Sequence, residues 1–114
     1  MFYRGLSCAS GKFGFPVIIY EVNVEYNPKI EAAYRAWLKP HIAEIVVIDG
    51  FMGCKVEEVL NPTGDWKSLC LRYELRDRDA LDQYLEGHAP RLRKDAVDHF
   101  GEDFKASRRV LRVL

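Results

Sequence analysis

Residues 17–45 read VIIYEVNVEYNPKIEAAYRAWLKPHIAEI, and they join a strand pattern to a helix pattern. Residues 17–25 are rich in β-branched side chains and alternate apolar residues onto one face, which is typical of a half-buried strand. Asn27 and Pro28 then favour a helix N-cap and a first helical position. Apolar residues follow at intervals of three and four, which predicts a helix with one buried face. This stripe comprises Ile30, Ala33, Tyr34, Trp37, Leu38, His41, Ile42 and Ile45.

The rest of the chain continues the alternation of strands and helices. Residues 51–60 and 66–75 alternate as strands around the turn-forming sequence NPTGD, so they predict a β-hairpin. An N-capping aspartate begins a short helix over 77–87, and an Ala-Pro pair begins another over 89–101; each of the two ends at a glycine. Residues 104–114 form the last predicted strand.

The element order is β-α-β-β-α-β with the second helical region split, and it predicts an α+β, ferredoxin-like fold. Four antiparallel strands in the order 4-1-3-2 would form one sheet with the helices on one face. Cys54 is predicted on the helix-facing side and Cys70 on the open side, so the two are not expected to lie opposite each other. A slip of one residue in the strand pairing would exchange the two faces. The helix-facing positions are Ile18, Tyr20, Val22, Val24, Met52, Cys54, Val56, Leu69, Leu71 and Tyr73. The open face carries Ile19, Glu21, Asn23, Lys55, Glu57, Cys70, Arg72, Glu74, Lys105 and Arg109.

Length and composition exclude several classes of protein. The chain has 114 residues, enough for one domain, and its 48% hydrophobic and 30% charged residues are typical of a folded protein. It has 17 basic and 17 acidic residues, so its zero net charge gives no general attraction to nucleic acid or anionic membranes. No apolar run approaches the ~18 residues of a membrane-spanning helix. The outward positions of the two central strands lack aromatic residues, so we expect no RNA binding by base stacking.

The cysteines and the N-terminus predict a cytoplasmic location. Three cysteines without a C-x-x-C spacing indicate reduced thiols rather than a disulfide framework or a zinc knuckle. Residues 1–16 lack the continuous apolar segment of a signal peptide, and we predict a flexible extension before a single domain over 17–114. A metal site would require His41, His88 and His99 to converge. No metal-ligand spacing, glycine-rich phosphate loop or G-x-S-x-G occurs, so we expect no metal and no cofactor.

The open sheet face predicts a symmetric homodimer. This face is charged and regularly patterned, and the same face of a second copy would cover it. Acidic and basic residues would then meet across the dyad, namely Glu21, Glu57 and Glu74 with Lys55, Arg72 and Arg109. The alternative is a monomer whose polar face is solvated, which antiparallel sheets tolerate.

Four segments resemble a bacterial family, the domain of unknown function number 4286. They are VIIYEVNV at 17–24, AWLKPHIAEI at 36–45, HAPRLR at 88–93 and HFGEDFKASRRVL at 99–111. The family is similar to the dimeric α+β-barrel group, whose members include cofactor-free monooxygenases, isomerases and stress-response proteins. The resemblance implies a small-ligand pocket between sheet and helices, but it implies no particular activity because fold does not determine function.

His41 is the candidate catalytic residue. It lies on the apolar stripe one turn after Trp37 and next to Pro40, which should kink the helix. An imidazole titrates near neutrality, so His41 could act as an acid, a base or a hydrogen-bond donor at a pocket mouth. The alternative is a buried histidine that binds a backbone carbonyl exposed by the kink.

Aromatic and basic residues supply the candidate ligand contacts. Five aromatic residues could line a cavity with a few hydroxyl groups, or could simply form the core: Tyr20, Tyr34, Trp37, Tyr73 and Tyr84. His88 and Arg91 lie where the second helical region is split, and a helix N-terminus with arginines can bind an anion. The alternative is that these arginines form surface ion pairs with Asp95 or Asp98.

Two functions of different classes follow from these residues. The first is a small cytosolic domain that binds a small organic molecule between sheet and helices. If it is an enzyme, it would perform cofactor-free proton transfer or oxygenation, with His41 as base or donor, Tyr20 or Tyr73 as hydrogen-bond partner and Trp37 as cavity wall. The second is a non-catalytic interaction or regulatory module whose interior is filled by its own aromatic side chains. An open pocket at His41 would favour the first, and a close-packed interior the second.

Overall fold

The structure is a computed structural model, and it describes residues 2–3 and 17–114. The strands are β1 (Phe2–Tyr3), β2 (Ile18–Tyr26), β3 (Phe51–Glu58), β4 (Lys67–Leu75) and β5 (Phe104–Arg112). The helices are η1 (Pro28–Ile30), α2 (Glu31–Val46), α3 (Arg78–Gly87), α4 (Ala89–Phe100) and η2 (Gly101–Asp103). In these ranges no helix is long and apolar enough to cross a lipid bilayer.

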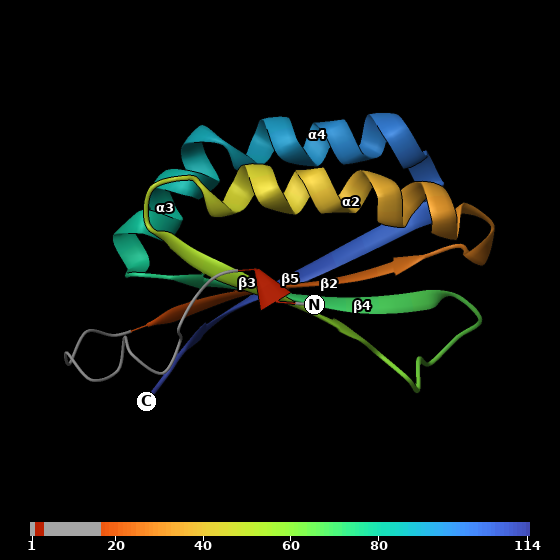
Figure 1. The fold of residues 1–114 in the computed structure, drawn as a ribbon, viewed down its shortest axis with the longest axis horizontal. Coiled ribbons are helices and arrows are strands. Elements are labelled where there is room, and N and C mark those ends of the chain that lie inside the picture. The colour runs from red at the N-terminus through yellow and green to blue at the C-terminus, as the bar shows by residue number, and fades with distance from the viewer. Residues whose placement is uncertain (1, 4–16) are drawn as a thin grey trace.

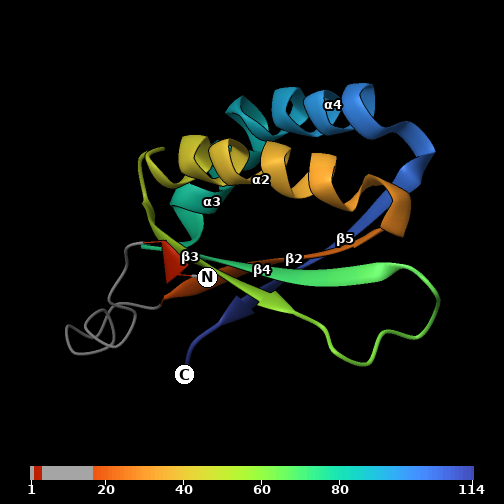
Figure 2. The same cartoon turned by 45° about the vertical axis from the view of Figure 1, so that its right-hand side comes forward.

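All paired strands are antiparallel, and they form one sheet in the order β1-β3-β4-β2-β5. The predicted order 4-1-3-2 is therefore confirmed for the four long strands. The three α-helices all lie on one side of the sheet (Figures 1 and 2), as the fold prediction required. The sheet has one strand more than predicted, because β1 pairs with the edge strand β3. Apart from β1, the predicted extension over 1–16 lies outside the described residues.

The strand register confirms the two predicted faces, with one correction. Cys54 lies opposite Tyr73, not opposite Cys70, and both side chains are buried under the helices. The register shifts between Phe51 and Gly53, so Phe51 occupies the core position that strict alternation predicted for Met52. A β-bulge adds one residue to a strand and changes which residue faces inward, which explains the wrong prediction for Met52.

The helix boundaries follow the predicted capping residues. The Asn27 side chain accepts a hydrogen bond from the Lys29 amide at 3.0 Å, and the first turn after Pro28 is a 3-10 turn before α2 begins. Asp77 caps α3 by accepting from the Ala80 amide at 2.9 Å. Helix α2 continues through Pro40 and buries Tyr34, Leu38, Ile42, Ile45 and Val46. Ala33, which the periodic pattern placed on the buried stripe, is exposed.

Aromatic side chains fill much of the space between sheet and helices. Tyr34 of α2 is 2% exposed, and its ring stacks on Tyr26 of β2 with a centroid distance of 4.7 Å. Phe51 of β3 meets Tyr73 of β4 and Tyr84 of α3 edge to face. These two groups of rings lie under the helices and bound the region in which the sequence predicted a pocket.

Candidate functional site

A cavity of about 50 Å³ lies between the sheet and the helices. Strands β2, β4 and β5 contribute its floor, and α2, α3 and α4 contribute its walls. The lining side chains are Tyr20, Val22, Val24, Tyr34, Trp37, Leu38, His41, Ile45, Leu71, Tyr73, Tyr84, Leu92, Arg93, Ala96, Phe104, Ala106 and Arg108. The cavity therefore gathers His41 and the five aromatic residues that the sequence singled out.

His41 lies against Trp37 in the wall formed by α2. The two rings stack with a centroid distance of 4.3 Å and an interplanar angle of 23°. Burial lowers the pKa of His41 below the ordinary value of 6.5 and outweighs the opposite effects of Glu44 and Asp95. The imidazole is therefore mainly neutral at pH 7 and able to accept a proton.

The predicted alternative for His41, a hydrogen bond to a backbone carbonyl, is not what the described part of the chain shows. Between residues 17 and 114 the imidazole has a ring contact with Trp37 but no hydrogen-bond partner. A buried polar group usually has such a partner. The nitrogen atoms of His41 are therefore available to a bound molecule.

The tyrosine hydroxyls of the cavity are neutral hydrogen-bonding groups. Burial raises the pKa of Tyr84 to about 12 and that of Tyr73 well above the ordinary value of 10.0. The Tyr20 ring lies edge to face with that of Tyr84 at 5.9 Å, and its hydroxyl accepts a hydrogen bond of 2.9 Å from Arg93. The Tyr73 and Tyr84 hydroxyls can therefore orient a ligand at neutral pH but cannot act as phenolate bases.

His88 and Arg91, the two remaining predicted contacts, do not line this cavity. His88 lies at the junction of α3 and α4 with its ring 6.3 Å from that of Tyr84. Arg91 donates to Glu44 of α2 at 2.8 Å, so its charge is compensated on the surface. The predicted partners of the arginines bind other residues instead, because Asp98 pairs with Lys94, and Asp95 with His99.

Arg93 and Arg108 also line the cavity. On β5, Phe104 and Ala106 pack against the core, and alternation then places Arg108 on the same face. The alternation from Phe104 was the signal that could have revealed its position.

The remaining candidate chemistries find no support in residues 2–3 and 17–114. No group of three or more His, Cys, Asp or Glu side chains is arranged there to hold a metal ion. Burial raises the pKa of Cys54 to about 12, so this thiol is protonated at neutral pH and is not a nucleophile. The pKa of Cys70 is also raised by burial.

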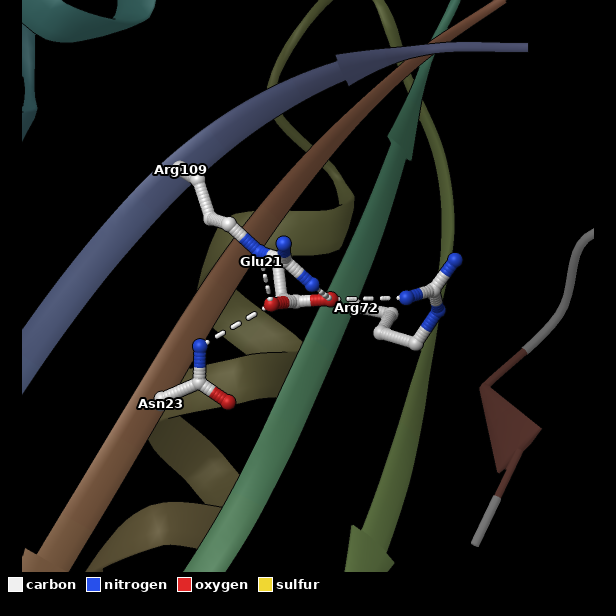
Figure 3. A network of polar contacts seen from close by, with 4 residues as sticks. All are labelled: Glu21, Asn23, Arg72 and Arg109. Carbon is white, nitrogen blue, oxygen red and sulfur yellow. Dashed lines mark hydrogen bonds and ion pairs between the residues drawn. The ribbon is translucent and has the colours of Figure 1, made fainter.

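A second polar cluster lies on the sheet face that carries no helix (Figure 3). Glu21 accepts hydrogen bonds of 2.7 Å from Arg72 and from Arg109, and one of 3.0 Å from Asn23. The Glu21 side chain is only 5% exposed because these neighbours cover it, while Arg109 is 65% exposed. The hydrogen bonds from Arg109 and Asn23 lower the pKa of Glu21, so the carboxylate is ionised at neutral pH.

A larger groove of about 320 Å³ lies between α2 and the sheet, lined by Arg35, Ala36, Leu38, Lys39, Ile42, Val56 and Leu69. Apart from two cationic side chains its lining is aliphatic. It offers no imidazole or hydroxyl group, so the smaller cavity is the better candidate for specific binding.

Fold and cavity together define the class of this protein, a ferredoxin-like α+β domain with a partly polar cavity under its helices. Residues 17–114 match the family described as Domain of unknown function (DUF4286), and the chain belongs to this family. No curated protein matches the chain in sequence.

Solved structures share the fold at low sequence identity. A conserved protein of unknown function from Bacteroides thetaiotaomicron, described as a possible oxidoreductase, is 11% identical, with 85% of this chain and 97% of that chain covered and a TM-score of 0.65. A protein from Nitrosomonas europaea with the provisional description antibiotic biosynthesis monooxygenase is 14% identical, with 82% and 88% covered and a TM-score of 0.58. A dimeric ferredoxin-like protein from an uncultured marine organism is 18% identical, with 87% and 96% covered and a TM-score of 0.50. Identities this low show a common fold only.

Proposed function

We propose that this protein binds a small organic ligand in the cavity between the sheet and helices α2 and α4. The observation that carries the proposal is the convergence of the His41 imidazole, tyrosine hydroxyls and two arginines on a cavity whose remaining walls are apolar. Apolar walls with a few convergent polar groups are typical of small-molecule sites. Two structural neighbours, one described as a possible oxidoreductase and one provisionally as an antibiotic biosynthesis monooxygenase, are compatible with such a site.

If the protein is an enzyme, His41 is the group best suited to move a proton. Its neutral imidazole would accept a proton from the bound ligand, and the Tyr20 hydroxyl would hydrogen-bond the charge that develops there. Trp37 would form the wall that orients the ligand. Proton transfer of this kind, as in an isomerase, requires only residues of the chain, whereas a cofactor-free monooxygenase would in addition consume molecular oxygen as its oxidant.

A thermal-stability screen against a library of metabolites tests the proposal. A compound that binds only the folded state stabilises it by about 2.7 kcal/mol at a concentration of 100 Kd, so its Tm rises. His41→Gln should lose most of this stabilisation, whereas Lys94→Gln, on the exposed side of α4, should keep it. A library without any stabilising compound would contradict the proposal.

The rival function, a non-catalytic interaction or regulatory module, is favoured by the size of the cavity. Its volume of about 50 Å³ is below the ~300 Å³ typical of ligand sites, and aromatic rings fill the space around it. Under this hypothesis His41→Gln would change neither the melting temperature in the presence of metabolites nor any catalytic rate.

The pH dependence of stability gives a prediction for His41 that does not require a ligand. The pKa of His41 is below 6.5 in the folded state, so below pH 6.5 the unfolded chain binds a proton more readily than the folded one. Wild-type protein should therefore lose stability relative to His41→Gln as pH falls from 7 to 5, by at most about 1.4 kcal/mol per pH unit. Urea unfolding at pH 5, 6, 7 and 8 measures this difference, and parallel curves for both proteins would contradict it.

We also propose that two copies of the chain pair through the outer sheet face in the cytoplasm. One structural neighbour is described as dimeric, and the Glu21 cluster offers charges of both signs on this face. Analytical ultracentrifugation should give twice the chain mass of 13.2 kDa. Arg109→Glu, which places two acids side by side, should shift the equilibrium towards the monomer, and a wild-type protein that is already monomeric would contradict the pairing.

A further inference from the structure

Two guanidinium groups from different elements line the cavity. Arg93 comes from α4 and Arg108 from β5, and both line the space that contains the Tyr20 and Tyr84 rings. Both arginines are also exposed, so the cavity reaches the protein surface beside them. A ligand could therefore enter between α4 and β5.

Neither guanidinium is neutralised by a carboxylate in residues 17–114. Arg93 donates to the Tyr20 hydroxyl, and Arg108 makes no hydrogen bond or ion pair there. Three other arginines are neutralised, since Arg72 and Arg109 pair with Glu21, and Arg91 pairs with Glu44. The two cavity arginines thus form an uncompensated positive region.

The two acidic side chains that act on His41, Glu44 and Asp95, already have partners. Asp95 accepts from the Trp37 indole at 3.3 Å and pairs with His99. Glu44 pairs with Arg91. The charge of Arg93 and Arg108 does reach into the cavity, because both lower the pKa of Tyr84 against the larger effect of burial.

From this arrangement we propose that the cavity is selective for a small organic acid whose carboxylate lies between Arg93 and Arg108. The planar guanidinium donates two parallel hydrogen bonds to a carboxylate, and two such groups on different elements define its position. The apolar body of the ligand would extend along the aromatic lining towards Trp37. This inference rests on the proposed function and adds the chemical class of the ligand.

The test compares benzoate with benzyl alcohol, which has the same ring but no carboxylate, by NMR titration of the full-length protein. Benzoate should bind at least tenfold more tightly than the alcohol. Arg93→Gln and Arg108→Gln should each weaken benzoate binding about tenfold and leave the alcohol unaffected. Arg78→Gln removes another exposed arginine, which pairs with Asp82 on α3, and it should not change binding.

The outcomes separate this inference from the proposed function. Binding of both compounds with equal affinity, and with shifts at Trp37 and His41, would support the cavity but overturn its selectivity for acids. Benzoate binding that is insensitive to Arg93→Gln and Arg108→Gln, or no benzoate binding at all, would also overturn the inference. Equal sensitivity to Arg78→Gln would show a nonspecific charge effect and overturn it as well.

Discussion

Tyr34→Ala is expected to lower the free energy of unfolding by about 4 kcal/mol. Tyr34 is 2% exposed, and its ring contacts those of Tyr26, Trp37, Phe100 and Phe104 at centroid distances of 4.7, 5.9, 5.2 and 6.3 Å. Removal of a buried aromatic side chain costs ~3–5 kcal/mol, because the apolar contacts are lost and a cavity remains. Since small domains have only ~5–15 kcal/mol of stability, urea unfolding should show a much lower midpoint.

The matched control is Tyr34→Phe, which keeps the ring and removes only the hydroxyl. It should cost less than about 1 kcal/mol, since the stacking contacts are retained. If Tyr34→Ala costs no more than Tyr34→Phe, the ring is not part of the core and α2 does not pack on the sheet as described.

Gly50→Ala is expected to destabilise the protein by about 2–4 kcal/mol. Gly50 has φ +92°, which side chains other than glycine adopt only with strain of ~1–2 kcal/mol. A Cβ atom here would also overlap the Cβ of Ala80, a buried residue in the N-terminal part of α3. The backbone has little freedom to move away, because the Gly50 carbonyl accepts a hydrogen bond of 2.8 Å from the Arg76 amide. Overpacking of this kind adds ~1–3 kcal/mol.

Two further variants isolate the causes. Gly87→Ala adds a methyl group where no atom lies within 4 Å, so it should change stability by less than about 1 kcal/mol. Gly50→Ala combined with Ala80→Gly removes the overlap but keeps the backbone strain, and a double-mutant cycle should show a favourable coupling between the two sites. Equal effects of Gly50→Ala and Gly87→Ala in thermal unfolding would place Gly50 away from Ala80.

Local patterns in the sequence were sufficient to predict most of the fold. Capping residues such as Asn27 and Asp77 and the glycine at 101 mark the helix ends, and alternation marks the strands. The bulge after Phe51 was not predictable, since it depends on how β3 meets β4 rather than on any local signal. The pairing of β1 with β3 was not predicted either, because a strand of two residues is too short to show a periodic pattern.

The candidate site was only partly predictable. Aromatic residues on the stripe of α2 and on the inner strand faces had to meet, because both faces are buried against each other. The position of Arg108 at the cavity follows from its alternation with Phe104 and Ala106 on β5, although its side chain is also exposed. The pairing of Arg91 with Glu44 depends on how α4 lies beside α2, which no periodicity encodes.

The indole N–H signals in the NMR spectrum test the ligand cavity most directly. The chain has two tryptophans, of which Trp37 lines the cavity, while Trp66 lies under Lys105 away from it. Trp66→Phe assigns the two signals, and the protein is then titrated with the compound that raises its melting temperature most. We expect the Trp37 signal to shift with the same Kd as the thermal stabilisation while that of Trp66 stays constant. The ligand cavity would be contradicted if the Trp37 signal stayed constant at saturation. The compound would then bind elsewhere, in the groove between α2 and β3 or on the outer sheet face.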